Sequence, residues 1–455
     1  MSIASDKRAT GPVAAFMRPI NSLVERYIPS ALVFVIVLTV VVAILALLLT
    51  DSGPVDVIRS WGDGLAGLLA FMTQMALVLL LGHALANTSP VHRLLTKLGG
   101  VPRTPVQAYS FVFVVAALAC LITWGLGLVV GGLLAKEVAA QARARGVKLH
   151  FPLLVAAGYS GFVVWHMGYS GSGPLAAATE GSFLTEQLGR TIPLGDTMFS
   201  PWNIAAAGAT IVVVALALAL VAPKRNAPIF ELEFDARDTQ VDEEKVVTPA
   251  DRLDASRILT LLVGLALVAY LAVHFIEGGT LTLDIVNWSF LALIFLLVRN
   301  PFELIRLVRN AASNVGDILL QFPLYAGILG MMVGSGLIGV FSDFFVNIAT
   351  PQTFGIMALL SAGLVNFFVP SGGGQFAVQG PIMLDAAERL GVDPSVAIMA
   401  VTYGDQWTNM IQPFWALPLL AIAGLKMRDI LGYTTITFLA AGLVFCVTLL
   451  IVGAG

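Results

Sequence analysis

Charged residues are scarce in this sequence, and cysteine is almost absent. Asp, Glu, Lys and Arg make up 12% of the 455 residues, whereas an ordinary soluble domain has about 25%. Because 58% of the residues are also hydrophobic, the composition excludes an ordinary globular enzyme. The two cysteines, Cys120 and Cys446, lie inside apolar runs, so we interpret them as small core residues and not as a disulfide, metal site or catalytic thiol. No run of one charge sign suggests nucleic-acid binding, and no motif predicts a bound cofactor or metal.

What the sequence has in abundance is apolar runs long enough to cross a bilayer. A chain of 455 residues has room for roughly ten spans of about 20 residues each. The first run, 32–50, is too long for a secretory signal and lacks a small-residue cleavage site, so it predicts a first membrane helix. Apolar helices are predicted at 28–50, 64–87, 199–222, 257–277, 281–298, 318–340 and 429–453.

Two further apolar tracts are interrupted in their middles. The tracts 104–135 and 344–384 contain no charged residue, yet glycine or proline breaks each of them. Each is too long for one span and too broken for two ordinary ones, so each predicts a hairpin of two helices joined by a tip. The predicted hairpins cover 104–143 and 352–389, and a broken helix follows each of them, at 151–189 and 394–424.

A constant offset relates the two interrupted regions. Adding 244 to the positions of Tyr159 and Pro174 gives Tyr403 and Pro418. Paired broken helices in two halves of a chain are the best sequence indicator of the substrate site of a secondary transporter. An extra helix, 257–277, turns the second half over, so the halves are predicted to be inverted-topology repeats with tips near the bilayer midplane. The predicted fold is an all-α polytopic membrane protein, divided into a first repeat at 1–222, a cytoplasmic linker at 223–256 and a second repeat at 257–455.

Basic residues near the spans indicate the orientation of the chain, because Lys and Arg accumulate in cytoplasmic loops. With the N-terminus in the cytoplasm, the loops around Arg93 and Arg306 and the polar, acidic linker all lie inside, and most opposite loops are acidic. We therefore predict a multi-pass protein with a cytoplasmic N-terminus. Within the linker, the run from Thr248 to Asp251 predicts the start of a helix.

The second tip is the sharpest candidate site. Its consecutive glycines leave backbone N–H groups free to converge on an anion, and a helix that follows points its positive end at the same place. A flexible turn is the alternative, but irregular backbone at membrane depth is tolerated only inside protein or beside a cavity. We predict that this tip binds a substrate carboxylate through Ser371, Gly372, Gly373, Gly374 and Gln375.

A polar stripe runs along one face of the second broken helix, at steps of three and four residues. Asp405 is its only charged member, and an acid at membrane depth indicates a functional site by default. We predict that Asp405 carries the coupling step as a proton carrier, with cation binding as the second reading and a structural Asp as the alternative. The stripe comprises Thr402, Asp405, Gln406, Asn409 and Gln412, and Tyr403, Gln406 and Asn409 are candidate substrate contacts.

The first broken helix contributes His166 and Ser170, which lie four residues apart on one face. His166 is the histidine deep in a predicted span, where it could donate to a substrate carboxylate or titrate during transport. A satisfied core histidine is the alternative. Thr123 and Trp124, at the first tip, are weaker candidates for substrate contact.

One motif favours a different class of protein. The segments 158–161 and 168–171 both match the Gly-x-Ser-Gly of rhomboid-type intramembrane serine proteases. The match is short, it recurs in a glycine-rich segment where small residues also serve helix packing, and His166 shares its helix with both serines. We therefore predict no enzyme, and a protease stays a remote alternative.

Three motifs resemble the bacterial short-chain fatty acid transporter family, and the likeness covers essentially the whole chain. It implies uptake of short monocarboxylates such as acetoacetate or butyrate through the inner membrane. It also implies membership of the ion transporter superfamily, whose known members are typically homodimers with a scaffold domain and a moving domain. That superfamily's Ser-Asn-Thr tips, which help hold sodium, are replaced here by 123–125 and 370–372. The motifs are Trp165-His-Met-Gly-Tyr-Ser-Gly-Ser-Gly173, Asn366-Phe-Phe-Val-Pro-Ser-Gly-Gly-Gly-Gln375 and Tyr403-Gly-Asp-Gln-Trp-Thr-Asn409.

Residues and resemblance together predict an anion transporter that works by elevator-type alternating access, with a proton or sodium as the coupling cation. The predicted moving unit comprises 104–189 and 344–424, and the remaining helices form the scaffold. A C4-dicarboxylate or other organic-anion carrier is the runner-up. It would need a second cationic or donor-rich subsite, and no Arg or Lys within the predicted spans supplies one. A channel is a different class, which would lack saturable counterflow.

Overall fold

The computed structural model describes residues 31–67, 69–122, 124–178, 188–223, 229–231, 248–279, 283–312, 315–337, 339–340, 347–367 and 372–453. Two candidate site residues, Thr123 and Ser371, lie outside the described residues. So do the N-terminal basic segment, most of the linker at 223–256 and positions 179–187 of the first predicted broken helix. Within the described residues the regular elements are helices, and no strand occurs.

Seven helices lie where apolar helices were predicted, within a few residues at each end. In the part of the chain that is described, six helices are long and apolar enough to cross a membrane by length and composition. Large apolar side chains such as Leu220 and Ile276 lie exposed on them, where lipid would surround them. The chain is a multi-pass, all-helical membrane protein. The seven helices are α2 (Ala31–Leu49), α4 (Leu69–Ala86), α11 (Pro201–Leu220), α13 (Arg257–Ile276), α14 (Leu283–Leu297), α16 (Gly316–Gly334) and α22 (Met427–Gly453).

Short helices that mix charged and apolar residues complete the framework. They are too polar for spans, so hydropathy did not predict α3 (Pro54–Gly64), α5 (Ser89–Gly99) or α15 (Pro301–Ala312). The helix start predicted at Thr248 is confirmed by α12 (Pro249–Asp254). There Thr248 Oγ1 accepts the Asp251 N–H at 3.2 Å, and Asp251 Oδ2 accepts the Thr248 N–H at 2.7 Å, which is a capping box.

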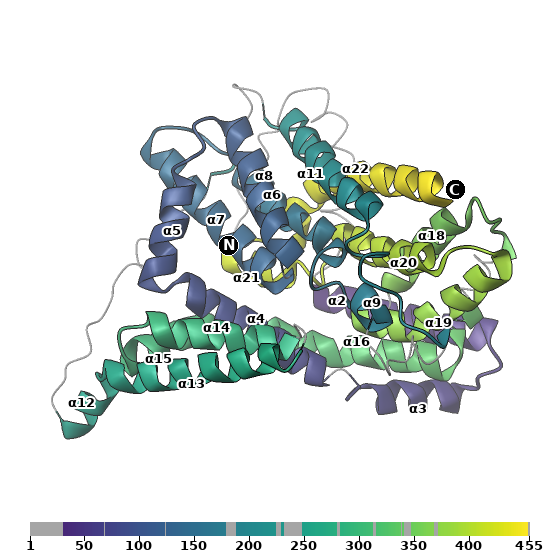
Figure 1. Ribbon diagram of the computed structural model, residues 1–455, viewed down its shortest axis with the longest axis horizontal. Coiled ribbons are helices and arrows are strands. Elements are labelled where there is room, and N and C mark those ends of the chain that lie inside the picture. Colours follow the sequence, from purple (N-terminus) through teal and green to yellow (C-terminus); the bar gives the residue numbers. More distant parts are fainter. Residues whose placement is uncertain are drawn as a thin grey trace.

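Each interrupted tract forms two antiparallel helices followed by a helix that breaks. The α-helical conformation changes to 3-10 at Gly161 and again at Asn409. Figure 1 shows the two hairpins toward opposite ends of the long axis, with the breaks between them. The first set is α6 (Pro105–Ile122), α7 (Trp124–Ala144), α8 (Phe151–Ser160), the 3-10 helix η1 (Gly161–Met167) and α9 (Ser172–Ala178); the second is α18 (Phe354–Asn366), α19 (Gly372–Leu390), α20 (Pro394–Thr408), the 3-10 helix η3 (Asn409–Ile411) and α21 (Leu417–Ala423).

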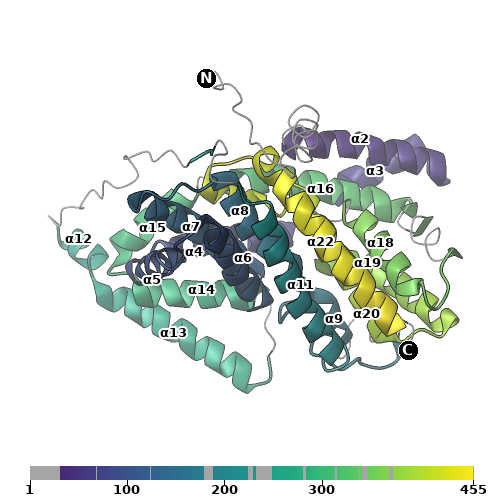
Figure 2. The same cartoon turned by 90° about the horizontal axis from the view of Figure 1, so that it is seen from above.

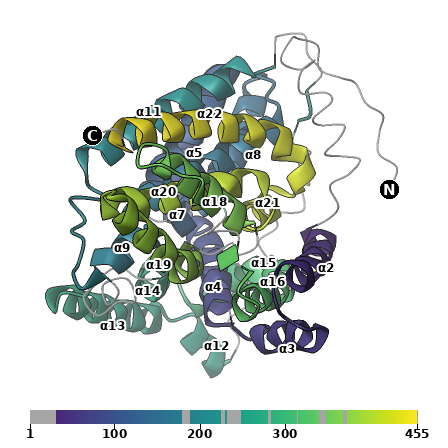
Figure 3. The ribbon, with the colours of Figure 1, turned by 90° about the vertical axis from the view of Figure 1, so that its right-hand side faces the viewer.

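The helices pack as two groups. One group comprises α2, α3, α4 and α13 to α16, and it forms the lower layer in Figure 1. The other comprises the hairpins and broken helices together with α11 and α22, which pack on each other and against α6, α8, α18 and α20. Figure 2 shows α11 and α22 side by side, and Figure 3 shows them on the face of the hairpin group away from α13 and α16. By contact, α11 and α22 therefore belong with the hairpins.

Side chains from both groups meet at Phe414, which follows η3. Its ring centroid lies 4.5 Å from that of Phe322 and 4.7 Å from that of Tyr325, both on α16. The contacts of α4 and α5 with α7 form the other junction between the groups. Within the hairpin group the backbones approach more closely: a Cβ added to Gly131 of α7 would lie 2.7 Å from the carbonyl oxygen of Gly158 on α8. Such a close crossing requires glycine on both helices.

The described part of the linker is attached to the start of the first broken helix. Phe230 donates its N–H to His150 Nδ1 at 3.2 Å, and its carbonyl accepts the N–H of Phe151 at 2.8 Å. Burial lowers the pKa of His150 to about 4, because the charged imidazolium loses its hydration there. His150 is therefore neutral near pH 7 and can accept this bond.

Candidate functional site

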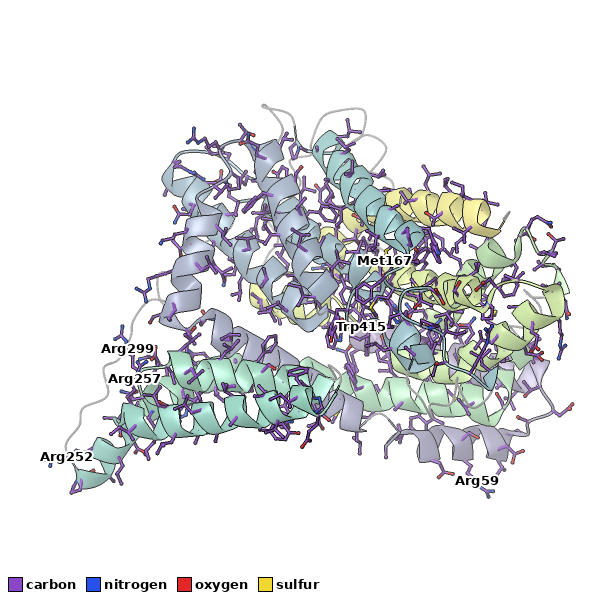
Figure 4. The ribbon with its side chains drawn as sticks, in the orientation of Figure 1. Arg59, Met167, Arg252, Arg257, Arg299 and Trp415 are labelled. Carbon is purple, nitrogen blue, oxygen red and sulfur yellow. The ribbon has the colours of Figure 1, made fainter. Side chains whose placement is uncertain are left out.

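The first break brings His166 to the centre of the molecule. After η1 the chain is extended at Gly168, and the N–H of Tyr169 is donated to the carbonyl of Leu121, at the end of α6, at 2.8 Å. The second break contributes Trp415. Figure 4 labels Met167, the last residue of η1, and Trp415, and both lie in the interior between the two hairpins.

His166 and Asp405 form a buried pair that joins the two halves of the chain. Nδ1 of His166 lies 2.7 Å from Oδ2 of Asp405, and the two side chains are 0% and 1% exposed. The backbone N–H of His166 is donated to Oε1 of Gln406 at 3.0 Å. The sequence offered both residues as candidates, and the structure adds that they contact each other.

The other ring nitrogen of His166 faces hydrogen-bond donors. Nε2 accepts the N–H of Gly173 at 3.2 Å, and Ser172 Oγ lies 3.3 Å from it. A backbone N–H can only donate, so Nε2 carries the lone pair and the proton sits on Nδ1, facing Asp405. The pair is thus a neutral histidine whose tautomer and orientation are set by a carboxylate.

The second tip closes over this pair. A Cβ added to Gly372, the first residue of α19, would lie 2.7 Å from Ser172 Oγ, 2.8 Å from Cη2 of Trp165 and 3.0 Å from Cε1 of His166. Only glycine fits so closely. Gly373 and Gly374 follow in the first turn of α19. The backbone amides of that turn therefore lie at the end of α19 that contacts the first break.

Asn366 fastens the end of α18 to the second break. Its Nδ2 lies 2.8 Å from the carbonyl oxygen of Asp405, 3.0 Å from Thr408 Oγ1 and 2.6 Å from Asn409 Oδ1. An amide nitrogen has two hydrogens, so three acceptors compete for them. The backbone carbonyl oxygen of Asn409 also accepts a hydrogen bond from the Tyr159 hydroxyl at 2.6 Å. Asn409, a predicted substrate contact, is held within this network.

The first tip is aromatic. Trp124, the first residue of α7, packs edge-on against Trp415 with a centroid distance of 5.1 Å. Its backbone N–H lies 3.4 Å from Ser170 Oγ, so Ser170 faces the first tip while His166 faces the second. Trp415 also contacts Phe162 at 5.3 Å and Trp165 at 6.3 Å. An aromatic cluster therefore lies between the first tip and the second break.

Two predicted contacts point elsewhere. Gln375 donates Nε2 to the carbonyl of Ala362 at 2.8 Å and to Gln379 Oε1 at 2.9 Å, so it bridges the arms of the second hairpin. The Tyr403 hydroxyl is donated to Asn203 Oδ1 of α11 at 2.8 Å. Neither side chain donates toward His166, and the spacing of the residues gave no signal for this.

Buried polar atoms without partners concentrate on these elements. A buried polar group left unpaired costs about 1–3 kcal/mol, so such atoms are rare unless a ligand or water serves them. Those on η1, α18, α19, α20 and η3, among the described residues, are Trp165 Nε1, Asn366 Oδ1, Gln375 Oε1, Asp405 Oδ1, Gln406 Nε2 and Asn409 Nδ2.

The site does not have the features of a hydrolase or a metal centre. Ser172 Oγ, His166 and Asp405 are connected in the manner of a Ser-His-Asp triad, but Nε2 of His166 already accepts the N–H of Gly173 at 3.2 Å, and Ser172 Oγ lies 3.3 Å from it. Ser160 of the first Gly-x-Ser-Gly match is engaged with Thr437 Oγ1 at 2.7 Å. Among the described residues, no three His, Cys, Asp or Glu side chains come together to hold a metal ion.

Comparison with known proteins identifies a family and several similar chains. Residues 13–452 match the family described as "Short chain fatty acid transporter". A protein of Escherichia coli (strain K12), provisionally named a short-chain fatty acid transporter, is 43% identical over 443 residues, which cover 96% of this chain and 99% of that one. A protein of the same provisional name from Haemophilus influenzae is 37% identical over 451 residues, 97% of this chain and 99% of the other. The crystal structure of the YdaH transporter of Alcanivorax borkumensis aligns with 92% of this chain and 98% of its own at a TM-score of 0.47 and 16% identity.

Proposed function

This chain belongs to the short-chain fatty acid transporter family, and we propose that it moves short monocarboxylates such as acetoacetate or butyrate across the bacterial inner membrane by cation-coupled alternating access. It is a multi-pass membrane transporter and not an enzyme. The observation that carries the substrate proposal is the junction of the second tip with the first break. There the start of α19 meets His166, Ser172 and Gly173 in the protein interior.

In this proposal the carboxylate of the substrate binds at that junction. The N-terminus of α19 supplies backbone amides and a positive helix end, and Ser371, which completes the tip in sequence, adds a hydroxyl. The unpaired Nε2 of Gln406 is held beside His166 by the bond between Gln406 Oε1 and the His166 N–H. The aliphatic part of the substrate lies toward the aromatic residues Trp165 and Trp415.

Element contacts support the proposal of inverted repeats. An offset of 244 brings the range of α2 close to α14, that of α3 to α15 and that of α4 to α16. Correspondingly, α2 and α3 pack on α16, while α14 and α15 pack on α4. Each half thus packs against the matching helix of the other half, as a twofold-related pair would. The sequence assigns 104–189 and 344–424 to the moving unit and all other helices to the scaffold. Because α11 and α22 pack on the first of these groups, we propose that α6 to α11 and α18 to α22 move as one body against the remaining helices, in the manner of an elevator.

The proposed orientation has the N-terminus in the cytoplasm. Arg252, Arg257 and Arg299 lie at one end of the molecule and Arg59 at the other (Figure 4). The positive-inside rule makes the end with the greater number of basic residues cytoplasmic. The resemblance to the superfamily further implies a homodimer, which we include in the proposal; the exposed apolar face of α13 would adjoin lipid or a second copy.

The coupling step is assigned to Asp405. A short-chain fatty acid is an anion near neutral pH, and its inward movement against a negative interior requires a compensating cation, a proton or sodium. One such cation per substrate makes the step electroneutral. Asp405 lies buried against His166, beside the proposed carboxylate position.

A C4-dicarboxylate carrier is the competing function. A second carboxylate would reach the side of the site occupied by Trp124, Trp415 and Phe162. These residues match an alkyl chain better than a second charge, because an unpaired buried charge is costly.

Uptake of radiolabelled butyrate into proteoliposomes tests the proposal. We expect saturable uptake that a pH or sodium gradient drives above equilibrium, and competition by acetoacetate but not by succinate. Preloaded unlabelled butyrate should accelerate uptake by counterflow. Absence of counterflow would indicate a channel, and stronger competition by succinate would favour the dicarboxylate alternative.

A further inference from the structure

We infer that a proton on Nε2 of His166 converts the closed first break into the carboxylate site, so that proton and substrate bind together. The inference rests on the proposed monocarboxylate transport and refines the coupling step assigned to Asp405, because it places the coupling proton on the histidine that Asp405 contacts. Asp405 then acts as the positioning residue that holds the ring, and the proton sits on the histidine.

Nε2 of His166 already has hydrogen-bond donors around it in the structure. In the structure its lone pair accepts the N–H of Gly173, and Ser172 Oγ is within reach of it. These are donors that a carboxylate would need. While Nε2 is unprotonated, the break satisfies its own donors, and Gly372 closes directly over them.

Protonation reverses the polarity of this contact. A proton on Nε2 points toward the N–H of Gly173, and two donors facing each other repel. The Gly173 N–H and the Ser172 hydroxyl lose their acceptor, while Nε2 becomes a third donor. Together with the unpaired Nε2 of Gln406, which is 0% exposed, these groups form a set that only an acceptor such as a carboxylate can satisfy.

The helix that ends at the same point adds to this preference. α19 is 19 residues long, and its first residue, Gly372, lies against Ser172 and His166. The positive end of that helix opposes a charged imidazolium but favours a carboxylate placed between them. A proton without a substrate is therefore disfavoured, and so is a substrate without a proton.

Charge is balanced in this scheme. Before binding, the site holds the Asp405 carboxylate and a neutral histidine; afterwards it holds the same carboxylate, an imidazolium and the substrate anion. The net charge is −1 in both states, since the proton offsets the substrate. The proton comes from the side on which the substrate binds and leaves with it on the other side.

No other charged group contacts His166 among the described residues of the elements packed around it. The charged residues of α7 and α19 begin more than three helical turns from the tips, and α9 and α11 have none. The hydroxyls of Tyr159 and Tyr403 are engaged with Asn409 and Asn203. The remaining titratable groups on α6, α7, α19 and α22 are Tyr109, Cys120, Lys136, Glu137, Arg143, Asp385, Glu388, Arg389, Arg428, Asp429, Tyr433 and Cys446.

Calorimetry of butyrate binding tests the inference. The purified full chain is titrated with butyrate near neutral pH in two buffers that differ in ionisation enthalpy, which counts the protons taken up. We expect uptake of about one proton per butyrate, and the loss of this uptake in His166→Gln. The matched control is His274→Gln, on α13 outside both breaks, which should keep it.

A second variant separates the proton from the carboxylate. Ser172→Ala should weaken butyrate binding by roughly tenfold, the equivalent of one lost hydrogen bond to a charge, without changing the number of protons. The ring nitrogen signals of His166 should also move to the doubly protonated form when butyrate is added.

The outcomes distinguish this inference from the proposed function. Butyrate binding without proton uptake, or with uptake unchanged in His166→Gln, would overturn the proton assignment and leave the transport proposal intact. No binding or counterflow of butyrate by the unmodified protein would overturn the transport proposal itself. If His166→Gln does not fold, the ring nitrogen signals of the unmodified protein decide, and a histidine that stays neutral in the bound state contradicts the inference.

Discussion

The first and second breaks follow corresponding helices in the two halves, but their chemistry differs. The first places His166, Ser172 and Gly173 under the start of α19. The second places Trp415 under the start of α7, in contact with Trp124. Each break is therefore covered by the tip of the other half, and one junction is polar while the other is aromatic. The proposed substrate, with a single carboxylate and a short apolar chain, matches both junctions.

The two junctions also differ in what holds them to the rest of the molecule. At the polar junction, hydrogen bonds connect His166 to Asp405 and Gln406 across the two halves. At the aromatic junction, Phe414 reaches the other helix group through Phe322 and Tyr325. Hydrogen bonds between the two halves are thus concentrated at the first break, and contact with the other helix group at the second.

The most direct way to remove the polar junction is to fill it. Gly372→Val should abolish butyrate binding and transport, because its Cβ alone would lie 2.7 Å from Ser172 Oγ and 3.0 Å from His166 Cε1. The measurement is counterflow in proteoliposomes, with thermal unfolding in detergent to show that the protein is folded. Gly208→Val on α11, where a Cβ meets nothing within 4 Å, is the matched control and should transport normally. Normal affinity in Gly372→Val would place the carboxylate elsewhere.

Asp405→Asn should separate transport from its driving force. Asn keeps the shape and can still bond His166, but it cannot balance an imidazolium. We expect counterflow to persist while accumulation of butyrate under a pH gradient falls at least tenfold, the effect of about 1.4 kcal/mol in coupling. Asp385→Asn, an exposed residue paired with Arg389 on α19, should accumulate butyrate as the unmodified protein does. Undiminished accumulation in Asp405→Asn would make Asp405 structural.

The sequence predicts where both tips and both breaks lie along the chain, because glycine, proline and polar residues interrupt otherwise apolar tracts, but it does not predict that each tip packs on the break of the other half. It also predicts the helical stripe that carries Asp405. It does not predict that His166 and Asp405 are in contact. They are 239 residues apart in the sequence, and their contact depends on how two separate helices are oriented in the fold. Periodicity identifies a face of a helix, but the partner of that face depends on packing.

The same limit explains the residues that sequence reasoning missed or misdirected. Ser172 and Gly173 belong to one of the three family motifs, but the sequence does not predict that both lie within hydrogen-bonding distance of Nε2 of His166. Gln375 was predicted to bind the substrate; its Nε2 bridges α18 and α19, while its Oε1 is buried without a partner. Trp415 carried no signal, because an aromatic residue in an apolar tract is the expected case. The packing of Trp415 on Trp124 is what gives it meaning.

The aromatic junction should set chain length. Trp124→Ala removes a ring that contacts Trp415 and would leave space beside the proposed alkyl position. Hexanoate has two more methylenes than butyrate, and each buried methylene is worth about 0.8 kcal/mol. We therefore expect the preference for hexanoate over butyrate to rise by up to about tenfold, measured as the ratio of their inhibition constants. Trp202→Ala, on α11, is the control and should leave that ratio unchanged. An unchanged ratio in Trp124→Ala would show that the aromatic junction does not determine the preference for substrate chain length.

The smallest effect is expected from His150, a partly buried histidine outside both breaks, and it sharpens the comparison by exclusion. His150 sits at the start of α8, where burial lowers its pKa to about 4, so it stays neutral throughout the range in which a free histidine titrates, near 6.5. Its folded pKa lies below its unfolded value, so the stability that the neutral form contributes is present above pH 6.5 and is lost as pH falls toward 4.

His150→Gln should therefore leave the pH profile of butyrate transport unchanged near neutrality. In the unmodified protein, protonation near pH 4 removes the acceptor of the Phe230 N–H, and limited proteolysis of the adjoining linker should then accelerate. A neutral-range shift of the transport profile in His150→Gln would mean that the first break does not set the proton dependence alone.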